Sequence, residues 1–405
     1  MKLLNFLRLE PKEQKLLKHV FIISSGICVL FIVITLIMHR FAYNKINAEG
    51  IIEEPLENDL SFLYRSNNED LLPIDIDAHK VAANHYNNDI NYTKIIKHYL
   101  RILSLESENR KIKFDLATIY LKSGIYSEAE KVFAEILLDK EKDTLTERAM
   151  ARYSINLFYL GKIDRSVEEL NRTIEKYPLS AEAYCYKGQV EASLDMTSDN
   201  AKLYFKKSIE LDPHFAETWY QLARYYMNKP KADSLDFLEA RICLLEQLKL
   251  EPLNAKGHSR LGMVYYYLKK PGLAEKSYQT ALTINPDDYN THYNLGELYY
   301  TFFNDSIRAM NEFLKAVKIN KYHTEANFKA GLVSLENENY KEAIRFFKTA
   351  LEQSPSNVRI LFQLAVAYEK NEMVTDAISI YNLILNFDAL NEIAHHKLKL
   401  LSFKR

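Results

Sequence analysis

A motif of small and large residues recurs nine times between Ile76 and Asn391, and it constrains the fold of this 405-residue chain more than any other feature. The clearest copy is Ala255–Asp288. In this copy Gly262 comes directly after a leucine, and alanine, tyrosine and proline come after Gly262 at fixed distances. The alanine of the motif returns at intervals of 34, 37, 35, 39, 34, 35, 34 and 34 residues. This period predicts an array of stacked units, each too small to bury its own core.

Three columns carry the motif, and their side chains predict helix packing. Small residues let two antiparallel helices approach closely, and a large residue then fills the space beside them. The first column holds only Gly, Ala or Ser: Ala83, Ala117, Ser154, Gly188, Ala223, Gly262, Gly296, Gly331 and Ala365. The second is alanine in seven copies of nine: Ile95, Ala129, Ser166, Ala201, Ala240, Ala274, Ala309, Ala343 and Ala377. The third is large: Tyr99, Phe133, Leu170, Phe205, Leu244, Tyr278, Phe313, Phe347 and Tyr381.

Proline marks the end of the second helix in five copies. Proline lacks an amide donor and clashes inside a helix, so we expect it between one helix pair and the next. We expect the extra residues of the longer copies to lie in turns, around Asp143–Glu147, Asp195–Asn200 and Asn228–Ser234. The five prolines are Pro178, Pro213, Pro252, Pro286 and Pro355.

These columns resemble the tetratricopeptide repeat (TPR). The resemblance implies an all-α fold, a TPR α-solenoid in which helix pairs form a right-handed superhelix. It places nine repeats in residues 76–391, and Glu392–Phe403 predicts a capping helix within a C-terminal segment of residues 392–405. The nine repeats are expected at residues 76–109, 110–143, 147–180, 181–215, 216–254, 255–288, 289–322, 324–357 and 358–391.

The N-terminal region predicts a membrane anchor. Val20–Met38 is a run of nineteen residues without a charge, close to the ~20 residues that span a bilayer. A cleaved signal peptide has a shorter apolar core, of about 7–15 residues, and a small-x-small cleavage site, whereas this run is followed by His39-Arg40. We therefore expect an uncleaved transmembrane helix at residues 20–38.

Charge predicts the orientation of that helix. The first forty residues carry a net charge of +4 and the remainder −5, and basic segments stay on the cytoplasmic side. We expect residues 1–19 in the cytoplasm, an acidic tether at residues 39–75, and the repeats outside the cytoplasm. In a Gram-negative cell this arrangement is a single-pass inner-membrane protein with a periplasmic TPR domain.

The sequence lacks the motifs of an enzyme. It contains no GxxxxGK[ST], GxGxxG, HExxH or GxSxG pattern. His258 and His292 occupy a repeat column that holds Trp219 in another copy, which indicates a packing position. We expect no catalysis, cofactor, metal or small-molecule substrate, and the net charge of −1 gives no broad attraction to nucleic acid.

Two cysteines lie on helices of adjacent predicted repeats, and their pairing stays open. Cys185 and Cys243 form no CxxC motif. Buried free thiols are the favoured interpretation because cysteine packs as a small hydrophobic residue. A single disulfide in an oxidising compartment is the alternative.

A groove that binds a C-terminal carboxylate would need several convergent Lys, Arg and Asn side chains. Lys256 and Arg260 match one element of such a clamp, but Gln189 and Gln221 stand where the other elements need asparagine. A second set contains Lys80 and Asn84, with Arg148 and Arg152, but Asp115 replaces its middle asparagine and would repel a carboxylate. Both clamps are therefore incomplete.

The resemblance implies a concave groove lined by the first helix of each repeat. Tyrosine, methionine and arginine are common at interfaces, and they concentrate in the middle repeats. Packing alone also explains tyrosine there. The candidate groove residues are Tyr220, Arg224, Met227, Lys256, Ser259, Arg260, Met263, Tyr266, Tyr293, Glu297 and Tyr300.

The resulting hypothesis is a membrane-anchored scaffold that binds protein or peptide partners and serves the assembly or maintenance of envelope complexes. The alternatives are an N-anchored targeting or chaperone receptor with cytosolic repeats, and a non-catalytic subunit of a membrane enzyme. Self-association into a homo-oligomer also stays open.

Overall fold

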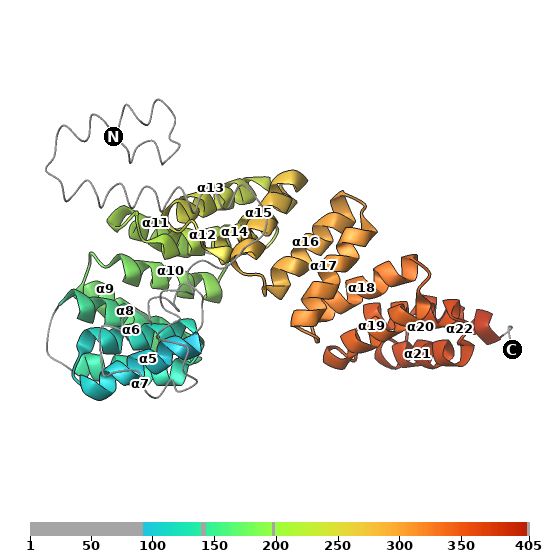
Figure 1. Ribbon diagram of the computed structural model, residues 1–405, viewed down its shortest axis with the longest axis horizontal. Coiled ribbons are helices and arrows are strands. Elements are labelled where there is room, and N and C mark those ends of the chain that lie inside the picture. The colour runs from blue at the N-terminus through green and yellow to red at the C-terminus, as the bar shows by residue number, and fades with distance from the viewer. Residues whose placement is uncertain (1–91, 139–142, 197–198, 403–405) are drawn as a thin grey trace, which may run out of the picture. The chain divides into compact units, whose positions relative to one another are not determined.

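The computed structural model describes residues 92–138, 143–196 and 199–402. These residues form eighteen α-helices, α5 to α22, and no strand (Figure 1). The chain divides into two units, Met1–Ile76 and Asp77–Arg405, and every described residue lies in the second. The predicted membrane helix at residues 20–38 falls outside the described residues, and none of the described helices is long and apolar enough to cross a bilayer.

Helices α6 to α21 alternate as first and second helices of consecutive pairs, and each helix packs against the next along the chain. Helix α5 precedes the first pair, and α22 packs against α21 at the end of the array. The bounds are α5 Tyr92–Leu105, α6 Arg110–Lys122, α7 Tyr126–Leu138, α8 Thr144–Tyr159, α9 Ile163–Lys176, α10 Ala181–Leu194, α11 Asn200–Leu211, α12 Ala216–Asn228, α13 Ser234–Leu250, α14 Ala255–Tyr267, α15 Pro271–Ile284, α16 Tyr289–Phe302, α17 Ser306–Ile319, α18 Thr324–Glu336, α19 Tyr340–Gln353, α20 Val358–Lys370, α21 Val374–Phe387 and α22 Glu392–Ser402.

The small column of each first helix faces the large column of its own second helix. A Cβ added to Gly262 of α14 would lie 2.6 Å from the ring of Tyr278 of α15. A Cβ on Gly331 of α18 would lie 2.5 Å from the ring of Phe347 of α19. Carbon atoms in contact are normally about 3.5–4.0 Å apart, so at these positions no residue larger than glycine fits without displacement.

The alanine and large columns form the core of the array. Ala274, Ala309 and Ala343 have no exposed surface, and neither do Phe313 and Phe347. Apolar burial stabilises by roughly 25 cal/mol per Å², and a fully buried aromatic side chain is among the largest single contributions. Because each unit repeats the same contact, the core is continuous along the chain.

Seven described turns between a first and a second helix contain a left-handed residue. Gly124 and Gly161 adopt φ of +80° and +76°, which glycine tolerates without strain. Lys269, Glu338 and Glu372 adopt the same region, with φ of 56°, 60° and 61°, at a steric cost of roughly 1–2 kcal/mol each. The sequence analysis did not predict this feature because the residues share a backbone conformation and not a side-chain type.

Links from a second helix to the next first helix combine proline with a cap. Pro252 lies between α13 and α14, and the side chain of Asn254, two residues later, accepts a hydrogen bond from the backbone N–H of Gly257. Pro355 and Asn357 repeat the arrangement before α20. Such a cap replaces a backbone partner that the first helical turn lacks, and stabilises the helix by about 1 kcal/mol.

One expectation about an insertion is wrong. The sequence analysis placed Asp143–Glu147 in a turn, but Asp143 is the N-cap of α8 and Thr144–Glu147 form its first turn. The carboxylate of Asp143 accepts from the backbone N–H of Thr146 at 2.8 Å. The extra residues therefore lengthen α8, because the side chain of Asp143 caps the added helical turn.

Replacement of Gly262 by alanine tests the close contact between α14 and α15. We expect Gly262→Ala to destabilise the array by about 1–3 kcal/mol because the new methyl overlaps the Tyr278 ring. Gly272→Ala, at a site with no neighbouring atom within 4 Å, is the control and is expected not to destabilise. Urea unfolding followed by circular dichroism measures both. Equal midpoints for the two variants would contradict the close contact.

Candidate functional site

Several consecutive first helices contact one another, as α8 contacts α10 and α14 contacts α16. We call the surface formed by α6, α8, α10, α12, α14, α16, α18 and α20 the first-helix face. A partner lying along it would meet side chains from several repeats at once, which makes it the candidate binding surface.

All eleven candidate groove residues lie on α12, α14 and α16. None is fully buried: Lys256 is exposed and the other ten are half-buried. Tyr220 and Met227 pack against the core around α12 and α13, and Tyr266, Tyr293 and Tyr300 against the core around α15 to α17. Packing against the core thus buries part of each of these aromatic and methionine side chains, and only the remaining surface is available to a ligand.

A ladder of polar contacts joins successive first helices. Ser259 and Thr291 are hydrogen-bonded through their hydroxyls at 2.6 Å, and Arg359 donates to Glu325 at 2.7 Å. The Tyr300 hydroxyl donates to Glu336. These contacts span one repeat, so they tie neighbouring units together and use charges that a ligand would otherwise meet.

The strongest rung of this ladder is at α8 and α10. Glu182 accepts from Arg148 Nε at 2.6 Å and from Arg152 Nε at 2.8 Å. Arg152 also donates to Thr118 of α6 at 2.7 Å, and both guanidinium groups lie over the ring of Phe114. The two arginines of the second incomplete clamp are therefore bound within the protein, and its Lys80 and Asn84 lie outside the described residues.

Glu297 on α16 is held in a half-buried aromatic environment. Its carboxylate pairs with Lys329 of α18 at 2.9 Å, and its second oxygen is buried without a hydrogen-bond partner. Burial raises the pKa of Glu297, and the Lys329 hydrogen bond and charge lower it by less. Burial also raises the pKa of the neighbouring Tyr293 hydroxyl.

Within the described residues no ion pair joins α12 to α14, and none joins α10 to α12, whereas such pairs join α8 to α10 and α16 to α18. Within the described residues, no carboxylate lies within ion-pair distance of Arg224, Lys256 or Arg260. The Arg224 guanidinium donates instead to the side-chain carbonyl of Gln221 at 2.9 Å. Gln221 in turn donates to Glu217 at 2.6 Å, and this chain holds the arginine in place.

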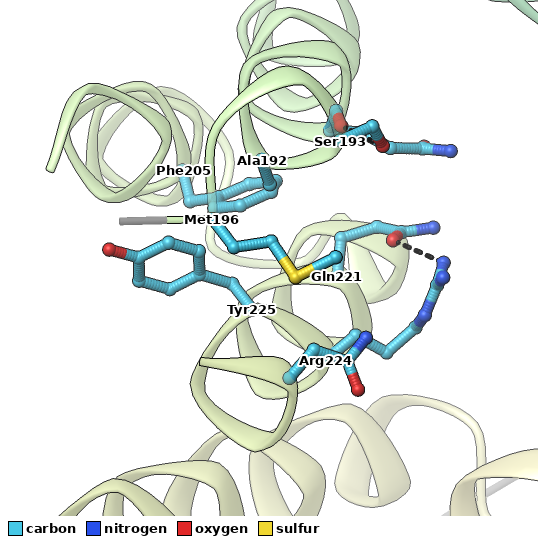
Figure 2. A pocket seen from close by; sticks show the side chains of 9 residues that line it. Ala192, Ser193, Met196, Phe205, Gln221, Arg224 and Tyr225 are labelled. Carbon is cyan, nitrogen blue, oxygen red and sulfur yellow. Dashed lines mark hydrogen bonds between the residues drawn. The ribbon is translucent and has the colours of Figure 1, made fainter. Parts of the chain in front are cut away.

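A pocket adjoins Arg224, between α10 and α12. Figure 2 shows Phe205, Met196 and Tyr225 beside the cavity, with Gln221 and Arg224 at its polar side. The cavity encloses about 70 Å³. Of the residues that line the pocket, the sequence analysis proposed only Arg224 as a groove residue. Gln189 occupies on α10 the same column that Arg224 occupies on α12. This shared column is the sequence signal that could have identified the other pocket residues.

Histidine and cysteine side chains have structural positions. His258 and His292 each bond through Nε2 to the carbonyl of a link proline, Pro252 or Pro286, at 2.8 and 2.9 Å. Cys185 and Cys243 are buried free thiols, and burial raises the pKa of Cys243 to about 12. A thiol this protonated at neutral pH is a poor nucleophile.

Three family models described as tetratricopeptide repeat match the chain, at residues 334–400, at residues 255–288, and at residues 154–214 with 301–358. Among solved structures, the APC/C hetero-tetramer Cut9–Hcn1 superposes with a TM-score of 0.53 at 17% identity, over 80% of this chain and 68% of that one. The array is therefore an all-α solenoid of tetratricopeptide repeats, as the sequence predicts.

The sequence identity between this chain and its curated relatives is too low to show a shared activity. The mitochondrial import receptor subunit TOM70 of Rattus norvegicus is 22% identical over 317 residues, which cover 77% of this chain and 52% of that protein. The anaphase-promoting complex subunit CDC16 of Saccharomyces cerevisiae is 26% identical over 246 residues, 59% of this chain and 28% of that protein. The chain spans about half the length of the TOM70 proteins that it matches.

Loss of Glu182 tests the rung between α8 and α10. We expect Glu182→Ala to destabilise the array by about 3–5 kcal/mol because two guanidinium groups, one of them largely buried, lose their counter-charge. Glu342→Ala removes an exposed partner of Arg345 and is expected to cost under about 1 kcal/mol. Hydrogen exchange should localise the first effect to α8 and α10. Similar losses in the two variants would contradict the assigned role of Glu182.

Proposed function

We propose that this protein is a non-catalytic scaffold that binds a protein or peptide partner on its first-helix face, with a membrane span at residues 20–38 holding it near membrane complexes. The observation that carries the proposal is the break in the polar ladder at α12 and α14. There, Arg224, Lys256 and Arg260 have no ion pair among the described residues, and half-buried aromatic and methionine side chains lie on the same helices.

The names of two relatives support partner binding. One is an import receptor subunit and the other a subunit of the anaphase-promoting complex. A third relative, the protein O-mannosyl-transferase TMTC3 of Homo sapiens, is an enzyme by name, but the matched part covers 22% of it. We therefore assign binding, and not transfer chemistry, to the repeats.

A tether at residues 39–75 would act by raising the effective concentration of the array at the membrane. Linked binding modules gain affinity when the linker lets them meet the same assembly. The basic N-terminus and acidic remainder support a cytoplasmic N-terminus and repeats outside the cytoplasm, at the inner membrane, with envelope complexes as clients.

A second candidate function is a targeting receptor whose repeats face the cytosol. The match to TOM70 over 77% of the chain favours it. The charge distribution around residues 20–38 opposes it.

Photocrosslinking tests the binding surface. A photoreactive residue at Met263 on α14 is expected to capture a discrete partner in cells because this position lies on the first-helix face. The same residue at Leu273 on α15, which is 46% exposed on a second helix, is the control and should capture much less. Stronger capture at Leu273 would place binding on the second helices and contradict the proposal.

Topology separates the two candidate functions. A dual reporter fused after Arg405 is expected to signal from outside the cytoplasm, since the basic residues flank the N-terminal side of the apolar run. A cytosolic signal would reject the proposed orientation and support the receptor. In that case, peptides ending in a carboxylate would become the first ligands to test.

A further inference from the structure

Helix α13 carries a row of apolar side chains on the side that faces away from the core. Leu235, Ile242 and Leu245 are 69%, 47% and 39% exposed, and Leu238 is half-buried. These residues recur at intervals of three and four positions, so they lie on one side of the helix. Among the described residues, the core around α12 and α13 includes other residues of α13 and none of these four. We call the four residues the α13 stripe.

The other repeats show that packing within the array does not require this stripe. Three of its positions recur in every second helix at fixed distances from the alanine column. At these positions α19 holds Lys341, Arg345 and Lys348. Among the second helices that the structure describes, α13 alone has a large apolar residue at all three. A solvated helix face normally carries polar residues, so the stripe indicates a contact that is specific to this repeat.

An added helical turn lengthens the stripe. Helix α13 has 17 residues, whereas α15 and α17 have 14 each. Relative to the alanine column, α13 begins three residues earlier than these two helices, and Leu235 lies in the added turn. Asp233 and Asp236 form a capping box there, and Asp236 is also paired with Lys229 at 2.9 Å. The chain therefore holds an exposed leucine in regular helix, in line with the rest of the stripe.

The charges beside the stripe have opposite signs on its two sides. Each residue advances a helix by about 100°, so Glu239 and Glu246 lie along one side of the stripe and Arg241 along the other. In the part of the chain that the structure describes, no carboxylate pairs with Arg241, and its Nε is buried without a hydrogen-bond partner. Glu246 pairs with Lys249 of its own helix at 2.5 Å, a surface contact of small energy. The stripe thus has a basic side and an acidic side.

This charge pattern makes the stripe complementary to itself. When two identical helices pair in parallel, opposite sides of their stripes meet, and Arg241 of each copy lies across from Glu246 of the other. In an antiparallel pair the same sides meet, so the acids Glu239 and Glu246 of the two copies face one another. Attraction between unlike charges and repulsion between like charges therefore favour the parallel pair.

The apolar residues have the spacing of a two-stranded parallel pair. Leu235 and Ile242 are seven residues apart, and so are Leu238 and Leu245. In a parallel pair with this spacing, each residue packs beside its own counterpart, and isoleucine at the first position with leucine at the second favours two strands. Lys249 occupies the next position of the series and ends the apolar contact. An interface that places each residue beside itself fits a second copy of the same sequence.

We propose that the α13 stripe joins two copies of this chain in a dimer whose two-fold axis runs parallel to the paired α13 helices. Such an interface uses the same surface on both copies and closes at two. One pair of helices buries less area than a standard protein interface, so the dimer is reversible. The contact lies on a second helix, so it does not involve the first-helix face and does not depend on the proposed function.

Cysteine crosslinking of the full-length protein tests the parallel arrangement. On a Cys28→Ser background, Leu235→Cys should form a disulfide-linked dimer under mild oxidation because the two copies of residue 235 lie side by side. Lys276→Cys, on the second helix α15 at the column of Ile242, is the control and should form none.

An antiparallel pair gives a different crosslink. It would place Leu235 beside Leu245 of the other copy and about 15 Å from its own counterpart. A disulfide between copies that carry Leu235→Cys and Leu245→Cys, with none in Leu235→Cys alone, would overturn the parallel arrangement. The absence of both disulfides would overturn the dimer.

A pair of matched variants assigns the dimer to α13. Ile242→Glu should weaken dimerisation at least about tenfold, because it buries a charge in the apolar contact. Leu314→Glu changes a similarly exposed residue of α17, 43% against 47%, and should leave dimerisation unchanged. Sedimentation of the full-length protein in density-matched detergent measures both. A dimer that persists in Ile242→Glu would place the contact elsewhere, for example at residues 20–38, and overturn the inference.

Charge exchange across the stripe gives a result that misfolding cannot produce. Arg241→Glu should weaken the dimer, since it then faces Glu246 of the other copy. Arg241→Glu combined with Glu246→Arg should restore the dimer because unlike charges meet again. Failure of the double variant to regain dimerisation would overturn the parallel arrangement. An unaltered chain that stays monomeric at about 100 μM would overturn the inference as a whole.

Discussion

The close approach of two helices within each repeat is the constraint on which the rest of the structure depends. A glycine, alanine or serine in the first helix lets an aromatic or leucine side chain of the second lie against the backbone, as Tyr278 does at Gly262. Because this contact recurs at the same column, each unit presents the same two outer surfaces to its neighbours. Several first helices consequently lie side by side, as α8, α10 and α12 do.

The side-chain columns made the fold predictable. They did not reveal the backbone conformation of the turns or the pairing of polar side chains. The alanine and aromatic columns specify which residues are buried, since volume and apolarity recur at a fixed period, and the structure confirms the repeats. Left-handed residues such as Lys269 and Glu338 share no side chain that a column could reveal. Asp143 began a helix where a turn was expected because its capping hydrogen bond stabilises an added helical turn.

The candidate site was only partly accessible from sequence for the same reason. Arginine, methionine and tyrosine could be placed on the first helices by counting positions, but a column does not show which charges are already satisfied. Glu182 binds two arginines, whereas the hydrogen bond that Arg224 makes among the described residues goes to the amide of Gln221. Whether a described carboxylate pairs with Arg224, and whether a cavity lies next to it, depend on neighbours in other repeats, so both required coordinates.

Hydrogen exchange of the full-length protein, with and without its bound partner, tests most directly whether the first-helix face is the binding surface. The account predicts slower exchange in α12 and α14 on binding, with α13 and α15 changed less, because a ligand on this face rigidifies the helices that it contacts. Slower exchange confined to α13 and α15 would contradict the account, since it would place the partner on the opposite surface of the same repeats.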